Sequence, residues 1–218
     1  MSKKMMLLAL AVVSAAAFAV PTGASAQEIH LTNVTTFGGT FGTGTLTAKE
    51  EPVITCGEAG NQNHVTGTVN AGGTTGEISL DFTACHTTIL GITRECHTAG
   101  APVNNTIKSS GVFHLITINE KPGILVTPVK TTLECQSAFA PITVEGNVIG
   151  TIISPACGVA SNSMTIKFSA AGAVQEHKTY TGVNYNLTAQ TTGFAIKEAG
   201  LVSESTTESA TAGTLDCT

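Results

Sequence analysis

The sequence predicts an all-β fold, either an antiparallel β-sandwich or a partly closed barrel, on three observations. Charged residues make up 11% of the 218 residues, which disfavours long solvated helices and coiled coils. Several segments alternate apolar and polar residues with a period of two, as strands with one buried face do. Clusters of Gly, Asn and Pro separate these segments and are typical of tight turns.

The first segment along the chain reads as a secretory signal peptide. Two lysines precede an apolar run from Met5 to Val20, and small residues at Ala24 and Ala26 follow it. The run is about 16 residues long, which is short for a membrane-spanning helix. We therefore expect residues 1–26 to be removed, and residues 27–218 to be secreted as one β domain without a membrane span.

The clearest strand of the mature chain is Glu77–Ala84, in which every second side chain is apolar. Further strands are expected at 43–48, 53–56, 64–69, 112–118, 124–130, 142–145, 148–153, 164–169, 184–189 and 194–197. Turns are expected at 70–76, 119–123 and 146–147. A weak helical period at 170–178 allows a short helical turn at most.

The pattern C-x8-V-x-G-x-V occurs twice, from Cys56 to Val69 and again from Cys135 to Val148. One interpretation is an internal duplication that divides the chain into halves at 27–121 and 122–218. The other is that a chain rich in Thr, Val and Gly produces such matches by composition.

Six cysteines follow the expected cleavage site, which predicts three disulfide bonds in an oxidising compartment. They are Cys56, Cys85, Cys96, Cys135, Cys157 and Cys217. The sequence does not choose among the 15 pairings that six cysteines allow. One hypothesis joins Cys85 to Cys96, Cys56 to Cys135, and Cys157 to Cys217, the last of which would anchor a loose polar tail from Ser203. The rival hypothesis joins Cys56 to Cys85.

Three groups of residues carry a resemblance to a known kind of protein. They are Ile54-Thr55-Cys56, the pair Phe82-x-x-Cys85 followed by Cys96, and Val144–Gly150 followed by Met164–Phe168. This pattern resembles uncharacterised secreted β-rich proteins encoded in actinobacterial genomes, over most of residues 52–169. The resemblance implies a compartment and a fold class but no catalytic residue, because these proteins carry no established activity. Cys157 and Cys217 are additional to the pattern, which favours pairing them with each other.

No motif in the sequence indicates a cofactor or metal site. Cys85-His86 and Cys96-His97 suggest zinc, but neighbouring side chains on a strand point to opposite faces, and oxidation would consume the thiolates. The glycine cluster at 38–44 lacks the lysine and helix of a phosphate-binding loop, and it reads as flexible hairpin or edge-strand glycine. We expect no nucleic-acid partner, because the mature chain has a net charge of −7 and a single arginine.

No catalytic motif is found either. The serine-hydrolase elbow G-x-S-x-G does not occur. Glu77 and Asp81 share one strand face, and they are the main carboxylates for an alternative hydrolase hypothesis in which a histidine could also take part. His30, His64, His114 and His177 are scattered one per segment. The mature chain has no Trp and two Tyr, which weakens a sugar-binding hypothesis without excluding it.

We therefore expect a secreted, non-catalytic β protein with a structural, adhesive or cell-envelope-associated role. Its polar strand faces would meet the envelope, a second copy or another surface. The alternatives are an extracellular hydrolase and a carrier of a small apolar ligand, and the carrier would need an enclosed pocket of several hundred Å³.

Overall fold

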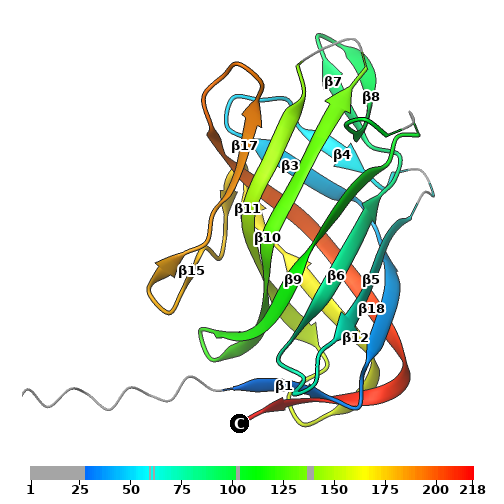
Figure 1. The fold of residues 1–218 in the computed structure, drawn as a ribbon, viewed down its shortest axis with the longest axis vertical. Helices are drawn as coiled ribbons and strands as arrows, with labels where there is room; N and C mark the ends of the chain where they lie inside the picture. The colour runs from blue at the N-terminus through cyan, green and yellow to red at the C-terminus, as the bar shows by residue number, and fades with distance from the viewer. Residues whose placement is uncertain (1–27, 59, 61, 102–103, 137–139) are drawn as a thin grey trace, which may run out of the picture.

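The computed structural model describes residues 28–58, 60, 62–101, 104–136 and 140–218, so the expected signal peptide lies outside the described residues. The described residues form β-strands and no helix, and all of the strand pairs are antiparallel (Figure 1). One 14-stranded sheet contains most of them. The predicted all-β, disulfide-linked class is confirmed, and the sheet closes on itself as a barrel does rather than forming two stacked layers.

Eight strands close a ring in the lower part of Figure 1. Around this lower ring the order is β18, β2, β5, β6, β9, β10, β11, β12 and back to β18. The strands are β2 (Thr36–Phe41), β5 (Asn63–Val69), β6 (Thr75–Phe82), β9 (Ile107–Ile118), β10 (Lys121–Cys135), β11 (Ile142–Ser154), β12 (Ala160–Phe168) and β18 (Lys197–Cys217). Both predicted halves contribute neighbouring strands to this ring, and the duplication itself stays a prediction.

A second ring lies above the first and shares the long strands β10, β11 and β18 with it (Figure 1). Its order is β10, β11, β17, β18, β3, β4, β7, β8 and back to β10. The added strands are β3 (Gly44–Ala48), β4 (Ile54–Cys56), β7 (His86–Ile89), β8 (Ile92–Thr98) and β17 (Leu187–Thr191). The three shared strands therefore join the two rings into one body.

The remaining strands lie outside both rings. β1 (Ile29–Thr32) pairs with the end of β18, so the two ends of the described chain lie side by side. Two small hairpins follow β12, and they consist of β13 (Ala170–Ala171), β14 (Val174–Gln175), β15 (Thr179–Tyr180) and β16 (Val183–Asn184). The weak helical period at 170–178 is thus part of this hairpin segment, and no helix forms there.

The prediction of a loose tail from Ser203 is wrong, because this segment belongs to the longest strand of the fold. β18 pairs with β12, β2, β3, β17 and β1 along its length. Three successive inward positions in its middle carry small polar side chains, namely Ser203, Ser205 and Thr207, which are buried. The Thr207 hydroxyl donates a 3.2 Å hydrogen bond to the Met164 carbonyl oxygen. Buried hydroxyls give a strand no apolar alternation, which is why the sequence pattern misses it.

The turn expected at Gly146-Asn147 is also wrong, because β11 runs through it without a break. Gly146 has a positive φ of 132°, and an added Cβ would overlap the carbonyl oxygen of Asn186. The glycine therefore permits the close approach of a neighbouring segment at an irregular point of the strand. By contrast, the hairpin predicted at 119–123 does turn at Asn119 and Glu120, both with positive φ.

The glycine cluster at 38–44 includes most of β2, which lies between β18 and β5 rather than at an edge. An added Cβ at Gly39 would overlap the carbonyl oxygen of Thr206 on β18. Glycine is needed there because the backbones of two strands come close together.

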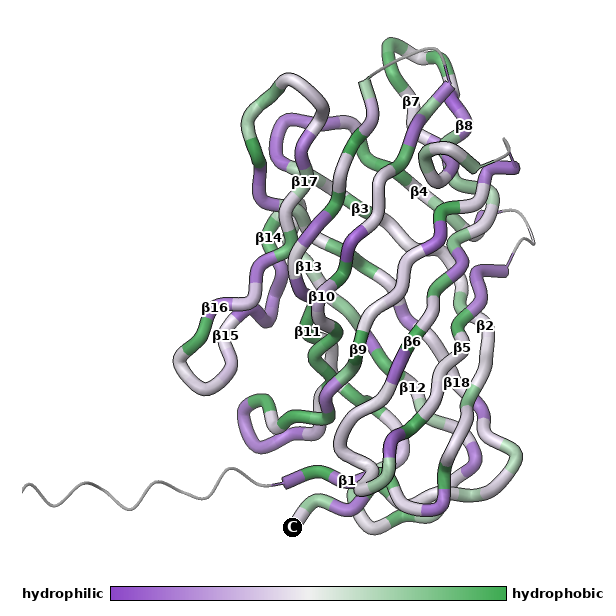
Figure 2. The backbone as a smooth tube through the Cα atoms, viewed as in Figure 1, coloured by the Kyte–Doolittle hydropathy of each residue, from purple (hydrophilic) through white to green (hydrophobic). Residues whose placement is uncertain are grey.

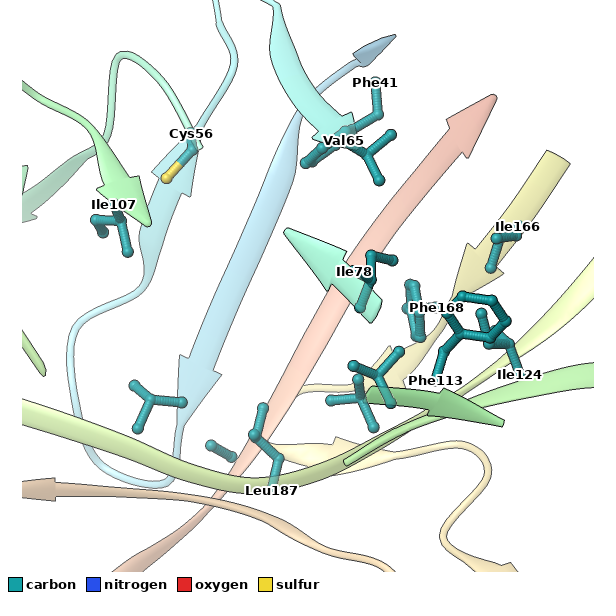
Figure 3. Close-up of a cluster of buried hydrophobic side chains, with 14 of the residues drawn as sticks. Phe41, Cys56, Val65, Ile78, Ile107, Phe113, Ile124, Ile166, Phe168 and Leu187 are labelled. Atoms are coloured by element: carbon teal, nitrogen blue, oxygen red, sulfur yellow. The ribbon is translucent and has the colours of Figure 1, made fainter. Parts of the chain in front are cut away.

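The interior of the rings is filled by aliphatic side chains and a few aromatic ones (Figure 3). Phe37 and Phe113 meet edge to face with ring centroids 5.8 Å apart, and Phe41 and Phe82 do so at 5.3 Å. Such pairs each contribute about 0.5–1.5 kcal/mol beyond the area they bury. Short hydrophobic and hydrophilic stretches follow each other along the strands (Figure 2), as expected when one face is buried and the other is not.

Candidate functional site

All six cysteines are bridged, so the structure leaves no free thiol for catalysis or metal binding. The pairs are Cys56 with Cys85, Cys96 with Cys135, and Cys157 with Cys217. The predicted pair Cys157 with Cys217 is confirmed, and so is the rival pair Cys56 with Cys85. The pairs Cys85 with Cys96 and Cys56 with Cys135 are wrong. Three such bonds are typical of proteins that fold in an oxidising environment.

Strand register explains this outcome. Cys96 on β8 lies directly opposite Cys135 on β10, so these two side chains can be joined without moving either strand. Cys85 is a backbone neighbour of Cys96, because the Cys96 amide donates a 2.8 Å hydrogen bond to the Cys85 carbonyl. The sulfur of Cys85 nevertheless bonds to Cys56 at the end of β4. The two disulfides together fasten the upper ring.

The two Cys-His pairs do not converge. The His86 ring lies 3.6 Å from the Glu58 carboxylate, whereas the buried His97 ring lies 3.9 Å from the carboxylate of Glu134. Among the described residues, no three His, Cys, Asp or Glu side chains gather as a metal ion would need. No helix in the described part of the chain has the length and apolar character to cross a bilayer.

The hydrolase candidates lie on an open strand face. Asp81 makes a 3.5 Å ion pair with Lys108, and His64 stands directly opposite Asp81 in the sheet register. The side chains of Lys108 and Asp81 are 66% and 37% exposed. Glu77 lies four residues from Asp81 on the same face, opposite Thr68. This face does not exclude water around the carboxylates, so it gives general acid–base chemistry no support.

Two residues in ion-paired clusters, His30 and Lys197, have a raised pKa. A 2.8 Å hydrogen bond to the Gly72 carbonyl, helped by the charges of Glu28 and Asp216, raises the pKa of His30. Glu51 and Glu50, at 3.2 and 3.6 Å, raise the pKa of Lys197. Both clusters lie at strand ends, where the charges join neighbouring segments.

The outer face of the lower ring carries rows of hydroxyl groups. Sheet register places Thr66 on β5, Ser79 on β6 and Ser110 on β9 in one row across three strands, and all three are exposed. Cross-strand partners in register stand about 5 Å apart at their Cβ atoms. The row therefore presents three evenly spaced hydroxyls to solvent.

A groove of about 720 Å³ contains this row. The next row is formed by Thr68, Glu77 and Val112, and the groove is bounded by Pro128 and Lys130 on β10. The register of β10 against β11 shifts between Val126 and Val129, so β10 is irregular where it bounds the groove. The groove combines hydroxyls with one carboxylate and one ammonium, which suits a partner rich in hydrogen-bonding groups.

The interior holds a much smaller cavity of about 60 Å³, near the level where the two rings meet. It is lined almost wholly by apolar side chains such as Leu80, Phe82 and Leu133. The hydroxyl oxygen of Ser109, a buried residue that also lines the cavity, has no hydrogen-bond partner among the described residues. The volume is far below the several hundred Å³ that a carrier of a drug-sized ligand needs. The cavity therefore does not favour the carrier alternative.

No protein-family model, curated protein or solved structure matches the chain. The sequence predicts contacts through polar strand faces, but it does not single out Thr66, Ser79 or Ser110. The signal was present in the polar positions of each alternating strand. Their alignment into a row depends on strand order and register, which a single sequence does not state.

Proposed function

We propose that the chain is a secreted, non-catalytic β protein that adheres to a cell envelope or a comparable surface. The single observation behind this proposal is the hydroxyl row Thr66, Ser79 and Ser110 inside the 720 Å³ groove. Hydroxyls at a regular spacing can donate and accept hydrogen bonds to a polymer whose own polar groups repeat. Several weak contacts made together give useful avidity.

Two further features support export and a long life outside the cell. The leading segment has the composition of a signal peptide, and three disulfides fasten the mature chain. Closed rings also leave few unpaired strand edges, which limits edge-to-edge aggregation of a protein in a crowded surface layer.

The test incubates the oxidised mature protein with isolated envelope fractions and measures retention after washing. The groove variant carries Thr66→Val, Ser79→Ala and Ser110→Ala. The matched control carries Thr40→Val, Thr165→Val and Thr206→Val, a second row of hydroxyls that sheet register aligns outside the groove. We expect retention of the wild type and the control, and loss of retention in the groove variant.

Three outcomes would overturn the proposal. Equal retention of the groove variant and the control would remove the groove from the contact. Turnover of generic ester, peptide or glycoside substrates, abolished by Glu77→Gln or Asp81→Asn, would replace adhesion with the hydrolase alternative. Sedimentation of the free protein as an oligomer that the groove variant dissociates would identify a second copy as the partner.

A further inference from the structure

A second apolar cluster lies on the outside of the lower ring. Leu115, Ile124 and Val148 belong to the interior core, whereas the next residue in each strand belongs to a separate buried cluster. These next residues are Ile116, Leu125 and Ile149. Because consecutive side chains of a strand point to opposite faces, this second cluster lies on the outer face of β9, β10 and β11.

The hairpin segment between β12 and β17 covers this outer cluster. Tyr180 on β15 and Tyr185 just after β16 pack against it, and both rings are half-buried. The Tyr185 amide donates a 2.7 Å hydrogen bond to the Lys178 carbonyl, which holds the hairpin closed at its base. In Figure 1 the β15 hairpin projects beside the lower ring. The only two tyrosines of the chain are therefore held together over an apolar floor.

A cleft of about 430 Å³ opens beside the two tyrosines. Its floor includes Ile116 and Leu125, and its polar lining includes His114, Thr74 and Glu28. Neither phenol hydroxyl nor the His114 ring makes a hydrogen bond within the described part of the chain. The cleft therefore offers two aromatic rings, an apolar floor and several polar groups that are free to bind a ligand.

We infer that this cleft binds a neutral sugar residue of a glycan. A pyranose ring has an apolar C–H face that suits aromatic and aliphatic side chains, and a rim of hydroxyls that suits phenol, imidazole and carboxylate groups. The volume lies within the usual range of about 300–1,000 Å³ for small-ligand sites. No Lys or Arg lines the cleft, whereas Glu28 does, so an anionic sugar would meet repulsion.

This inference deepens the proposed adhesive role by naming a ligand class, yet it concerns a different hollow, which lies next to the hydroxyl groove on the outer face of β6, β9 and β10. The groove residues on β5 and β6 and the tyrosine hairpin line different hollows. The two proposals can therefore fail independently. The groove is tested by retention on envelope fractions, and the cleft is tested by titration with soluble sugars.

The chain provides its own reporter for the titration. It has no tryptophan and two tyrosines, both in the cleft, so all of its tyrosine fluorescence arises there. Titration with a panel of neutral methyl hexopyranosides should change this fluorescence saturably, with dissociation constants in the millimolar range. Amide signals of Tyr180, Tyr185 and His114 should shift with the same midpoint in NMR spectra.

Three variants complete the test. The double variant Tyr180→Leu, Tyr185→Leu keeps an apolar cover over the cluster but removes both aromatic faces. Its sugar binding is followed by the NMR shift of His114, because no tyrosine fluorescence remains. We expect its affinity for the sugar to be at least tenfold weaker than that of the wild type. Tyr180→Phe with Tyr185→Phe preserves the packing, should fold in any case, and should bind several-fold more weakly through the lost hydroxyls. The triple groove variant at Thr66, Ser79 and Ser110 should bind sugars as the wild type does.

The inference is overturned if no member of the panel changes the fluorescence or the NMR shifts. It is also overturned if sugar affinity survives in the double leucine variant, because the tyrosines would then not form the site. A response to a small aromatic hydrocarbon without any response to sugars would identify the cleft as an apolar pocket. Tighter binding of a uronic acid than of its neutral counterpart would contradict the assigned ligand class.

Discussion

Replacing Ser109 tests the account of the interior directly. Its hydroxyl is buried beside the 60 Å³ cavity and has no hydrogen-bond partner in the part of the chain that the structure describes. A buried hydroxyl without a partner costs about 1–3 kcal/mol. Ser109→Ala removes this cost and should raise the free energy of unfolding by about 1 kcal/mol. Stabilisation is an unusual result for a buried position, because most substitutions there destabilise.

Ser109→Val should stabilise further, because its methyl groups extend into the cavity and valine suits a strand. Cavity volume costs about 24 cal/mol per Å³, so filling all of the 60 Å³ would contribute about 1.4 kcal/mol at most. We expect a total gain of about 2 kcal/mol. For a chain of this size each kcal/mol corresponds to about 2–4 °C in Tm.

The assay is calorimetric and urea-induced unfolding of the oxidised protein. Ser110→Ala is the matched control, because Ser110 is the next residue of β9 and is exposed on the opposite face. Its effect should stay within about 0.5 kcal/mol. Destabilisation of about 1 kcal/mol or more by Ser109→Ala would refute the reasoning, since it would mean that the hydroxyl is satisfied, for example by a buried water.

The remaining predictions concern the ring, the chain ends and pH. Gly67→Ala should destabilise by about 1–3 kcal/mol in urea unfolding, because its Cβ would overlap the Phe37 ring. Replacing both Cys157 and Cys217 by Ser should lower the free energy of unfolding by about 4 kcal/mol, since this bond closes a loop with a sequence separation of 60. NMR titration should give His30 a pKa above its ordinary value, owing to its hydrogen bond to a backbone carbonyl. Because the folded-state pKa is raised, the stabilisation from His30 is present below about pH 6.5 and is lost as the pH rises through the folded-state value.

A contradicting result follows for each change, with a control variant for Gly67. Gly42→Ala meets no atom within 4 Å and should be neutral, so equal effects at Gly42 and Gly67 would refute the packing argument. A loss below 1 kcal/mol in the double serine variant would mean that the pairing of β1 with β18 already holds the chain end. For His30, the wild type should exceed His30→Gln in stability at about pH 5, and the difference should shrink by about pH 8. A constant difference would contradict the assignment.

The sequence was informative about local structure. Alternation correctly located strands such as β5 and β6, where every second side chain enters an apolar interior. It failed for β18, because the buried positions Ser203, Ser205 and Thr207 are polar. Those hydroxyls are tolerated because they can bond to neighbouring backbone, as Thr207 does to Met164. This part of β18 is held by its backbone pairing with β12 and β2 rather than by the burial of apolar side chains.

Disulfide pairing and site geometry depend on register, which is a long-range property. Cys96 pairs with Cys135 because β8 lies beside β10, although 39 residues separate them in sequence. The hydroxyls of Thr66, Ser79 and Ser110 form one row for the same reason. A mature chain with two tyrosines and no tryptophan weakens a sugar-binding hypothesis, and only the fold reveals that the two tyrosines share one cleft.

Cross-saturation NMR on envelope-bound protein tests the adhesive role most directly. Irradiation of isolated envelope fragments should attenuate amide signals most strongly at Thr66, Ser79 and Ser110 and their neighbours in the groove. Attenuation centred on the β7–β8 hairpin, or spread evenly over the surface, would contradict the claim that the hydroxyl groove is the contact face.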